Sequence, residues 1–337
     1  MLKDPHYLES KHGTKDFQSV LLFRSMQCSP LVIHHRNFLP SRLKVKKANN
    51  RKIMERTIPI DPDLEKGYNV RLLVDDFDGL IEKWSNWSEK FRAKVDSSLN
   101  CQYGNGEKDK LDIFRCGEPN APLFVFIHGG YWQRGDKSIY SFVAESFVNS
   151  GIDVALIGYQ LCPGASMTNI VEKIREAIVW LWKNAEDYSI SKNRINVSGH
   201  SAGGHITGMV LTTDWSLISN DLPKDIVKTG IPISGLYQLD PIRETTIADA
   251  LGLDDEESLA LSPHFFEPQT EAPILVTLGG GETPEFHWQT DNFVNRWNKF
   301  KAPLDYFAEP EVDHFGVVER LSNKDSEIFN KFKEWLL

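Results

Sequence analysis

Short apolar runs alternate with longer amphipathic segments along most of the chain. The run 123–127, Leu-Phe-Val-Phe-Ile, is continuous and strand-sized, whereas residues 169–187 carry apolar side chains at three- and four-residue steps, as a half-buried helix does. The same criteria predict further strands over 101–103, 111–116, 154–158, 195–198, 230–233, 274–278 and 304–307, and further helices over 76–93, 139–149, 202–212, 285–300 and 325–337. This alternation predicts an α/β fold with a mostly parallel sheet that helices cover on both faces.

Residues 1–56 depart from this pattern. They show no sustained periodicity, and their 12 lysines and arginines against 4 acidic residues give a charge of +8, whereas the rest of the chain carries −17 and the whole chain −9. Such an asymmetry marks a segment of separate origin or role. We therefore predict one domain over 57–337, preceded by a basic extension. This extension is either a functional or disordered arm or a gene-model artefact upstream of a start at Met54, and we favour the second.

Composition narrows the class of protein. With a net charge of −9, the chain is not expected to bind nucleic acid, and no apolar run approaches the roughly 18 residues of a membrane-spanning helix. The four cysteines lack CxxC or zinc-site spacing, and the N-terminus does not read as a signal peptide. We expect a cytoplasmic protein that acts on a small molecule without a metal or other cofactor and without nucleic-acid or membrane partners. A homodimer is compatible with this composition.

A nucleophile is predicted at Ser201. Residues 199–203, Gly-His-Ser-Ala-Gly, match the G-x-S-x-G pattern between the predicted strand 195–198 and the predicted helix 202–212. A sharp strand-to-helix turn leaves no room for bulky side chains two residues either side of the serine. It also lifts the hydroxyl to a helix N-terminus, where negative charge is favoured. An ordinary strand–helix turn is the alternative interpretation.

A second motif supplies candidate hydrogen-bond donors. Residues 128–132, His-Gly-Gly-Tyr-Trp, directly follow the predicted strand 123–127. Acyl transfer needs preorganised N–H groups around the developing oxyanion, and glycine lets the backbone approach a substrate closely. We expect His128 to hold this loop. The expected donors are the backbone N–H groups of Gly129, Gly130 and Ala202. The aromatic side chains expected to line a substrate pocket are those of Tyr131, Trp132 and Phe315.

The catalytic base is expected late in the chain. In proteins whose nucleophilic serine occupies such a strand-to-helix turn, the nucleophile, the acid and the histidine follow one another in that order along the chain. His314 comes after the last predicted strand and before the closing helix, so it is the candidate base. The acid should follow the strand 274–278, where the turn contains two glutamates, Glu282 and Glu285.

Glu282 is the first candidate for the acid. Proline is favoured at the first helical position, so a helix that begins at Pro284 leaves Glu282 in the turn. Glu285 then lies in the first helical turn, where its charge complements the helix dipole. Glu285 remains the second candidate, and Asp313, beside His314, is the third.

These motifs resemble those of α/β-hydrolases of the hormone-sensitive-lipase-like group, and within it those of the kynurenine formamidase and bacterial esterase branch. The resemblance covers about residues 61–337 and is carried by segments 128–132, 199–205, 235–239, 282–286 and 313–315. It implies an α/β-hydrolase fold and a serine hydrolase that cleaves an N-formyl arylamide and releases formate. It also implies a triad of Ser201, the acid of this turn and His314. One departure is Glu282, where formamidases usually carry aspartate.

Two other functions use the same sequence features. A carboxylesterase for short-chain esters would need the same nucleophile, base and oxyanion donors. A catalytically silent α/β-hydrolase used for binding is the third possibility, although every catalytic role has a candidate residue in this chain.

Overall fold

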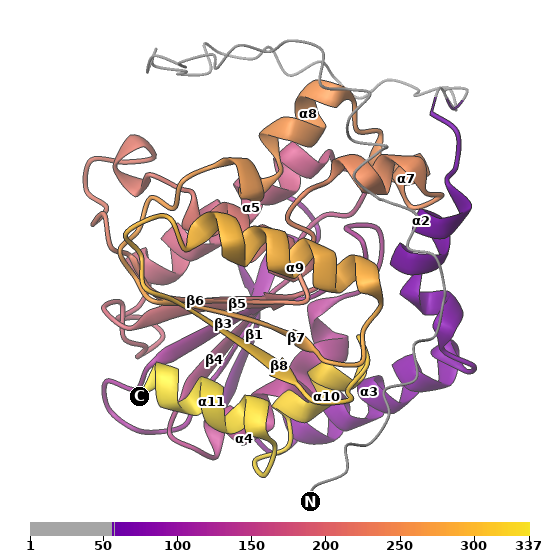
Figure 1. Cartoon of the computed structure of the whole chain (residues 1–337). Helices are drawn as coiled ribbons and strands as arrows, with labels where there is room; N and C mark the ends of the chain where they lie inside the picture. Colours follow the sequence, from indigo (N-terminus) through magenta and orange to yellow (C-terminus); the bar gives the residue numbers. More distant parts are fainter. Residues whose placement is uncertain (1–55, 57) are drawn as a thin grey trace, which may run out of the picture. The chain divides into compact units, whose positions relative to one another are not determined.

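An eight-stranded sheet forms the centre of this computed structural model, which describes residues 56 and 58–337 (Figure 1). The strand order is β1-β2-β4-β3-β5-β6-β7-β8. The pairs β1–β2 and β2–β4 are antiparallel and the other neighbours are parallel, which confirms the mostly parallel sheet. The strands are β1 (Ser97–Gln102), β2 (Lys110–Phe114), β3 (Leu123–Ile127), β4 (Asp153–Ile157), β5 (Ile195–His200), β6 (Val227–Ile233), β7 (Ile274–Gly279) and β8 (Leu304–Glu309).

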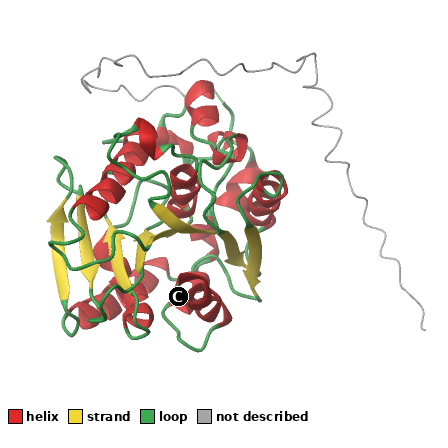
Figure 2. Ribbon diagram, turned by 90° about the vertical axis from the view of Figure 1, so that its left-hand side faces the viewer, coloured by secondary structure: helices red, strands yellow, loops and turns green. Residues whose placement is uncertain are grey.

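Helices cover both faces of the sheet (Figure 2). One face packs against α5 (Met167–Lys183), α6 (Ala202–Leu211) and α9 (Pro284–Trp297). The other packs against α3 (Phe77–Arg92), α4 (Ala144–Val148), α10 (Gly316–Leu321) and α11 (Glu327–Leu336). The remaining helices are α2 (Pro62–Tyr68), α7 (Ala248–Leu251) and α8 (Asp255–Ala260). No helix in the described part of the chain has the length and apolarity needed to cross a membrane.

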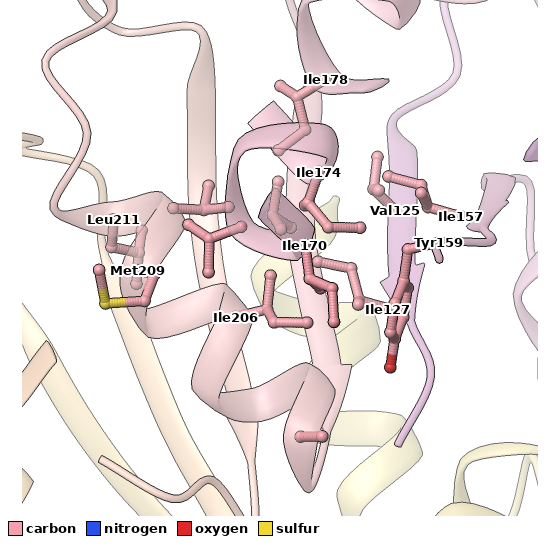
Figure 3. Packing of buried hydrophobic residues seen from close by; sticks show 14 of the residues in the cluster. Val125, Ile127, Ile157, Tyr159, Ile170, Ile174, Ile178, Ile206, Met209 and Leu211 are labelled. Carbon is pink, nitrogen blue, oxygen red and sulfur yellow. The ribbon is translucent and has the colours of Figure 1, made fainter. Parts of the chain in front are cut away.

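Strand β3 shows why the sheet separates two hydrophobic cores. Successive side chains of a strand point to opposite faces. Val125 and Ile127 therefore join the core under α5 and α6, as Figure 3 shows, whereas Phe124 and Phe126 join the core on the other face. All five residues of the strand are fully buried, which explains the unbroken apolar run in the sequence.

The long helices begin where polar side chains cap them. The Ser166 hydroxyl accepts a hydrogen bond from the Asn169 N–H at the start of α5, and Asp76 accepts one from the Gly79 N–H at the start of α3. Because α5 is amphipathic, its buried face carries isoleucines at four-residue steps, Ile170, Ile174 and Ile178 (Figure 3).

Short elements account for most differences from the sequence predictions. The predicted helix 139–149 is a 3₁₀ helix, η2 (Lys137–Val143), that continues into α4. The helix α2, which begins at the N-cap Asp61, and α10, which precedes the closing helix, were not predicted. Helices of six or seven residues span fewer than two turns, too few for a hydrophobic period to emerge from the sequence.

The predicted basic extension lies outside the described residues, apart from its last residue. The chain divides into the units Met1–Glu55 and Arg56–Leu337, so Arg56 belongs with the domain predicted over 57–337. Its guanidinium forms an ion pair of 2.7 Å with Asp249 and donates to the Thr245 carbonyl oxygen.

We expect a chain that begins at Met54 to fold and to keep its activity. Every candidate catalytic residue lies after that point, and the contacts of Arg56 are retained. The thermal midpoint should lie within about 4 °C of that of the full chain, the shift that about 1 kcal/mol produces at most in a domain of this size. Calorimetry and activity assays on both chains test this, and an insoluble or inactive short chain would show that residues 1–53 belong to the domain.

Candidate active site

Ser201 occupies a sharp turn between β5 and α6. Its backbone has φ 58° and ψ −116°, a conformation that non-glycine residues rarely adopt and that the surrounding contacts maintain. The Ser201 N–H donates to the Ile233 carbonyl oxygen at 2.9 Å, and its own carbonyl oxygen accepts from the His205 N–H at 3.0 Å. The strand-to-helix turn predicted from the sequence is therefore present, with the serine at its tip.

The two glycines of the motif are required by close backbone contacts. A Cβ atom at Gly199 would lie 2.4 Å from the Gly203 carbonyl oxygen, and one at Gly203 would lie 2.0 Å from the Ile127 carbonyl oxygen. Both distances are far inside van der Waals contact. The turn, its following helix and the end of β3 thus approach one another more closely than any larger residue would allow.

The glycine loop after β3 runs directly against the serine turn. A Cβ atom at Gly129 would lie 3.1 Å from the Ser201 Cβ and 2.9 Å from the His200 carbonyl oxygen. Gly130 has φ 117°, and a Cβ there would lie 2.2 Å from the Arg134 carbonyl oxygen. The two segments that carry the expected oxyanion donors, Gly129–Gly130 and Ala202, are therefore brought together.

His314 and Glu282 form a buried pair at the carboxyl ends of β8 and β7. The His314 Nδ1 lies 2.6 Å from the Glu282 Oε2, and the side chains are 5% and 0% exposed. The other carboxylate oxygen, Oε1, accepts hydrogen bonds from the Ser234 hydroxyl at 2.5 Å and the Gly279 N–H at 2.8 Å. Every oxygen of this buried carboxylate is thus hydrogen-bonded, as its burial requires.

Ser234 is a part of the site that the sequence analysis missed. It follows β6, has φ 48° and is fully buried. Its position in the sequence could have indicated it. A polar residue directly after a parallel strand lies at the same edge of the sheet as the turn that carries Glu282.

The two other candidate acids are held elsewhere. A Cβ atom at Gly67 would lie 2.0 Å from the Glu285 Cδ, so the Glu285 side chain lies against the backbone of α2. The Asp313 carboxylate accepts from the N–H groups of Phe315 and Gly316, which fixes the turn into α10. The helix α9 begins at Pro284, as predicted, and leaves Glu282 in the turn.

The His200 ring connects the serine turn to this pair. Its centroid lies 4.5 Å from that of His314. Burial lowers the pKa of His200 well below its ordinary value, and the neighbouring His314 lowers it further. In the described structure Ser201 and His314 are not hydrogen-bonded to each other, and such contacts are often long before substrate binds.

His128 holds the glycine loop, as expected. Its Nδ1 lies 2.8 Å from the Gly129 carbonyl oxygen, and its ring stacks on that of Tyr159 at 4.3 Å. Complete burial lowers its pKa to about 4. A neutral, buried imidazole in these contacts is a structural element of the loop.

The three aromatic residues expected in a substrate pocket have different environments. Trp132 is 0% exposed and its Nε1 donates to the His205 Nδ1 at 3.2 Å, so it anchors the loop in the core and presents no surface to a ligand. The Tyr131 hydroxyl donates to the Tyr68 carbonyl oxygen. Phe315 is half-buried and packs edge-to-face on Phe77, with ring centroids 5.4 Å apart. The structure thus gives Trp132 an anchoring position, in place of the substrate contact that was expected.

His205 makes stability dependent on pH. Trp132 can only donate, so the His205 Nδ1 accepts, and the proton must be on Nε2, which donates to the Leu261 carbonyl oxygen at 2.6 Å. Burial lowers the pKa of His205 from 6.5 to about 4. The unfolded state binds a proton on this histidine more readily than the folded state does. The contribution of His205 to the free energy of unfolding is therefore fully present above about pH 6.5 and decreases as the pH falls towards 4.

We therefore expect His205 to contribute a loss of about 2 kcal/mol in unfolding free energy between about pH 7.5 and pH 5. Urea unfolding at both pH values measures it. In His205→Gln the side chain can still accept and donate but does not titrate, so the loss should be smaller by that amount. An identical pH dependence in both proteins would contradict this assignment.

In residues 56 and 58–337, no group of three or more histidine, cysteine, aspartate and glutamate side chains is placed to hold a metal ion. What the site offers chemically is a hydroxyl at a helix N-terminus, a buried imidazole–carboxylate pair and a glycine loop that runs against the serine turn.

Sequence comparisons identify relatives over most of the chain. The BD-FAE family model matches residues 111–229. The kynurenine formamidase of Salmo salar is 32% identical over 248 residues, which cover 71% of this chain and 81% of that protein. The kynurenine formamidase of Danio rerio is 30% identical over 245 residues with the same two coverages.

Solved structures share the fold. A protein from Silicibacter sp. TM1040, solved as a candidate thioesterase, matches with a TM-score of 0.70 and 30% identity over 80% of this chain and 98% of its own. An esterase from Pyrobaculum calidifontis matches with a TM-score of 0.60 and 18% identity over 82% and 98%.

Fold and sequence together define the class of protein: the chain is a hydrolase of the α/β-hydrolase type. The two kynurenine formamidases named above match at 30% identity or more over four fifths of their length. The chain belongs to the kynurenine formamidase family.

Proposed function

We propose that this hydrolase cleaves an N-formyl arylamide to formate and an arylamine, with Ser201 as nucleophile, His314 as base and Glu282 as the orienting acid. The observation that carries the proposal is the buried hydrogen bond of 2.6 Å between His314 and Glu282, beside a serine in a strand-to-helix turn. The identity to two kynurenine formamidases supports the formyl amide as substrate.

In the first half of the reaction, His314 takes the proton of the Ser201 hydroxyl through its Nε2 while Oγ attacks the formyl carbon. The carbonyl oxygen becomes an oxyanion, which the N–H groups of Gly129, Gly130 and Ala202 stabilise. Glu282 stabilises the imidazolium that forms. The C–N bond then breaks, His314 gives its proton to the departing arylamine, and a formyl ester remains on Ser201.

In the second half, water attacks the formyl ester while His314 takes a proton from it. The same N–H groups hold the second oxyanion. The bond between the formyl carbon and the Ser201 Oγ breaks, the proton on His314 goes to Oγ, and formic acid leaves, which loses its remaining proton to water as formate. Every step uses only this chain's own residues and water.

A carboxylesterase for short-chain esters is the second candidate, because esterases are among the solved relatives and would use the same residues. Comparing kcat/KM for N-formylkynurenine and p-nitrophenyl acetate separates the two. We expect the formamide to be preferred by at least about tenfold, one decade being about 1.4 kcal/mol in transition-state binding. A preference for the ester would transfer the assignment to the esterase.

A fluorophosphonate probe tests for the nucleophile itself. It should label the wild-type chain at Ser201. A chain that neither reacts with the probe nor turns over either substrate would be a binding protein built on this fold.

A further inference from the structure

A segment before the sheet contacts three parts of the candidate site: the turn that carries Glu282, the loop that carries His314 and the glycine loop. We call residues 61–77, which contain α2 and η1 (Val70–Leu73), the N-terminal strap. Its α2 lies beside the start of α9 (Figure 1). The Gly67 carbonyl oxygen accepts from the Thr283 hydroxyl at 2.8 Å in the turn next to Glu282, and Phe77 packs on Phe315 next to His314.

The strap's third contact reaches the glycine loop. The Tyr131 hydroxyl donates a hydrogen bond to the backbone carbonyl oxygen of Tyr68, 63 residues away. The Tyr68 hydroxyl in turn accepts from the Gln289 Nε2 at 3.0 Å, and the Gln289 Oε1 accepts from two backbone N–H groups, those of Tyr237 and Gln238, at 2.8 Å each. The carbonyl that Tyr131 contacts therefore belongs to a residue that is itself fixed in a buried network.

The strap is also held at its other end. Glu65 accepts from both the N–H and the hydroxyl of Thr246 at 2.7 Å, and the Asp61 N–H donates to the Glu244 carbonyl oxygen at 2.8 Å. These anchors make the strap a fixed support for the loop.

The glycine loop needs such support because its backbone conformation is unusual. Gly130, Tyr131 and Trp132 have φ 117°, 50° and 58° in succession, and two of them are aromatic residues for which this region is unfavourable. Such a conformation persists only where other contacts determine it. Besides His128, which holds the start of the loop, Trp132 and Tyr131 make such contacts: Trp132 is hydrogen-bonded to His205 and Tyr131 to the strap.

We propose that Tyr131 is a positioning residue, whose hydrogen bond to the strap holds the Gly129 and Gly130 N–H groups where the oxyanion forms. This inference rests on the proposed function, and it differs from the sequence expectation that Tyr131 contacts the substrate. A positioning role affects the transition state more than the bound substrate, so kcat should fall while KM stays nearly constant.

The test is Tyr131→Phe, with Tyr103→Phe as the matched control. The Tyr103 hydroxyl also donates to a buried backbone carbonyl, that of Gly158, at 2.7 Å, so both variants lose one hydroxyl and one bond of the same kind. The assay uses N-formylkynurenine or p-nitrophenyl acetate, whichever the wild type turns over faster. Tyr131→Phe should lower kcat about 10- to 100-fold, since small displacements of oxyanion donors reduce the rate by this much. Tyr103→Phe should stay within about threefold of the wild type, because it alters no donor to the oxyanion.

A second readout isolates the oxyanion. An aryl trifluoromethyl ketone adds to a serine Oγ and gives a tetrahedral adduct whose oxygen occupies the oxyanion position. Its Ki should rise in Tyr131→Phe by about the same factor as kcat falls, and stay unchanged in Tyr103→Phe. If KM rises and kcat does not, Tyr131 is a substrate contact and the proposal is overturned. Equal effects of both variants on kcat and Ki would overturn it as well.

Gln289→Met covers the case in which Tyr131→Phe does not fold. It releases the Tyr68 side chain and leaves Ser201, Glu282 and His314 unaltered. The proposal then expects lower kcat and a higher Ki with little change in KM, and it is abandoned if both are unchanged. Activity that persists in Ser201→Ala would contradict the proposed function, independently of the strap.

Discussion

Ser201→Ala should lower kcat by about 10⁴-fold or more while the protein stays folded. The substitution removes the atom that would form the covalent ester, and alanine fills the turn without new contacts because it is the smaller residue. The backbone hydrogen bonds of the turn, to Ile233 and from His205, do not involve the side chain. Steady-state kinetics and thermal unfolding of the same preparation measure both halves of the expectation.

Ser198→Ala is the matched control. Ser198 is buried in β5, three residues before Ser201, and its hydroxyl donates to the Ile231 carbonyl oxygen at 2.6 Å. Ser198→Ala should lose this hydrogen bond and about 1 kcal/mol of unfolding free energy. Its kcat should stay within about threefold of the wild-type value, and it should still react with a fluorophosphonate. Ser201→Ala with a tenth of the wild-type activity would remove Ser201 from the mechanism.

Glu282→Gln should lower kcat by roughly 10²–10⁴-fold. The Glu282 Oε1 accepts from Ser234 and Gly279, so in the variant the amide oxygen keeps these donors and the NH₂ group faces the His314 Nδ1. That nitrogen must then accept, which puts the imidazole proton on Nε2. A protonated Nε2 cannot take the proton of Ser201, so the variant keeps its packing and loses its base.

Glu285→Gln is the comparison that distinguishes the two glutamates. It should change kcat by less than about tenfold, because a charge in the first turn of a helix contributes only about 0.3–1 kcal/mol. Both variants are measured at one pH with one substrate. The reverse order of effects would transfer the role of the acid to Glu285, and two small effects would point to Asp313 or to a mechanism without an acid.

Periodic segments and local motifs were predictable because they depend on neighbouring residues. The strand 123–127 coincides with β3, and the helix start at Pro284 is confirmed, since a buried strand and a proline at the first helical position leave local signals. The prediction of an α-helix over 139–149 was wrong in part, because the first half of this segment is a 3₁₀ helix. Over so few residues, 3₁₀ and α-helices place apolar side chains at similar spacings.

Contacts between distant segments left no such signal. The hydrogen bond from Ser234 to Glu282 joins residues 48 apart, that from Trp132 to His205 joins residues 73 apart, and each depends on how strands are ordered in the sheet. The aromatic pattern of residues 131 and 132 suggested a pocket wall, because a side chain that anchors a loop and one that contacts a ligand are the same residue type in a sequence.

By itself, the sequence determined the α/β class, the serine in its glycine turn, the glycine loop after β3 and the late histidine, because strand and helix periods and the steric demands of a turn act over a few residues. Only the tertiary structure decided which acid faces His314. Glu282, Glu285 and Asp313 carry the same charge, and each is a candidate by its position in the chain. The packing of α2 holds Glu285, the turn before α10 holds Asp313, and Ser234 and Gly279 orient Glu282 towards the imidazole.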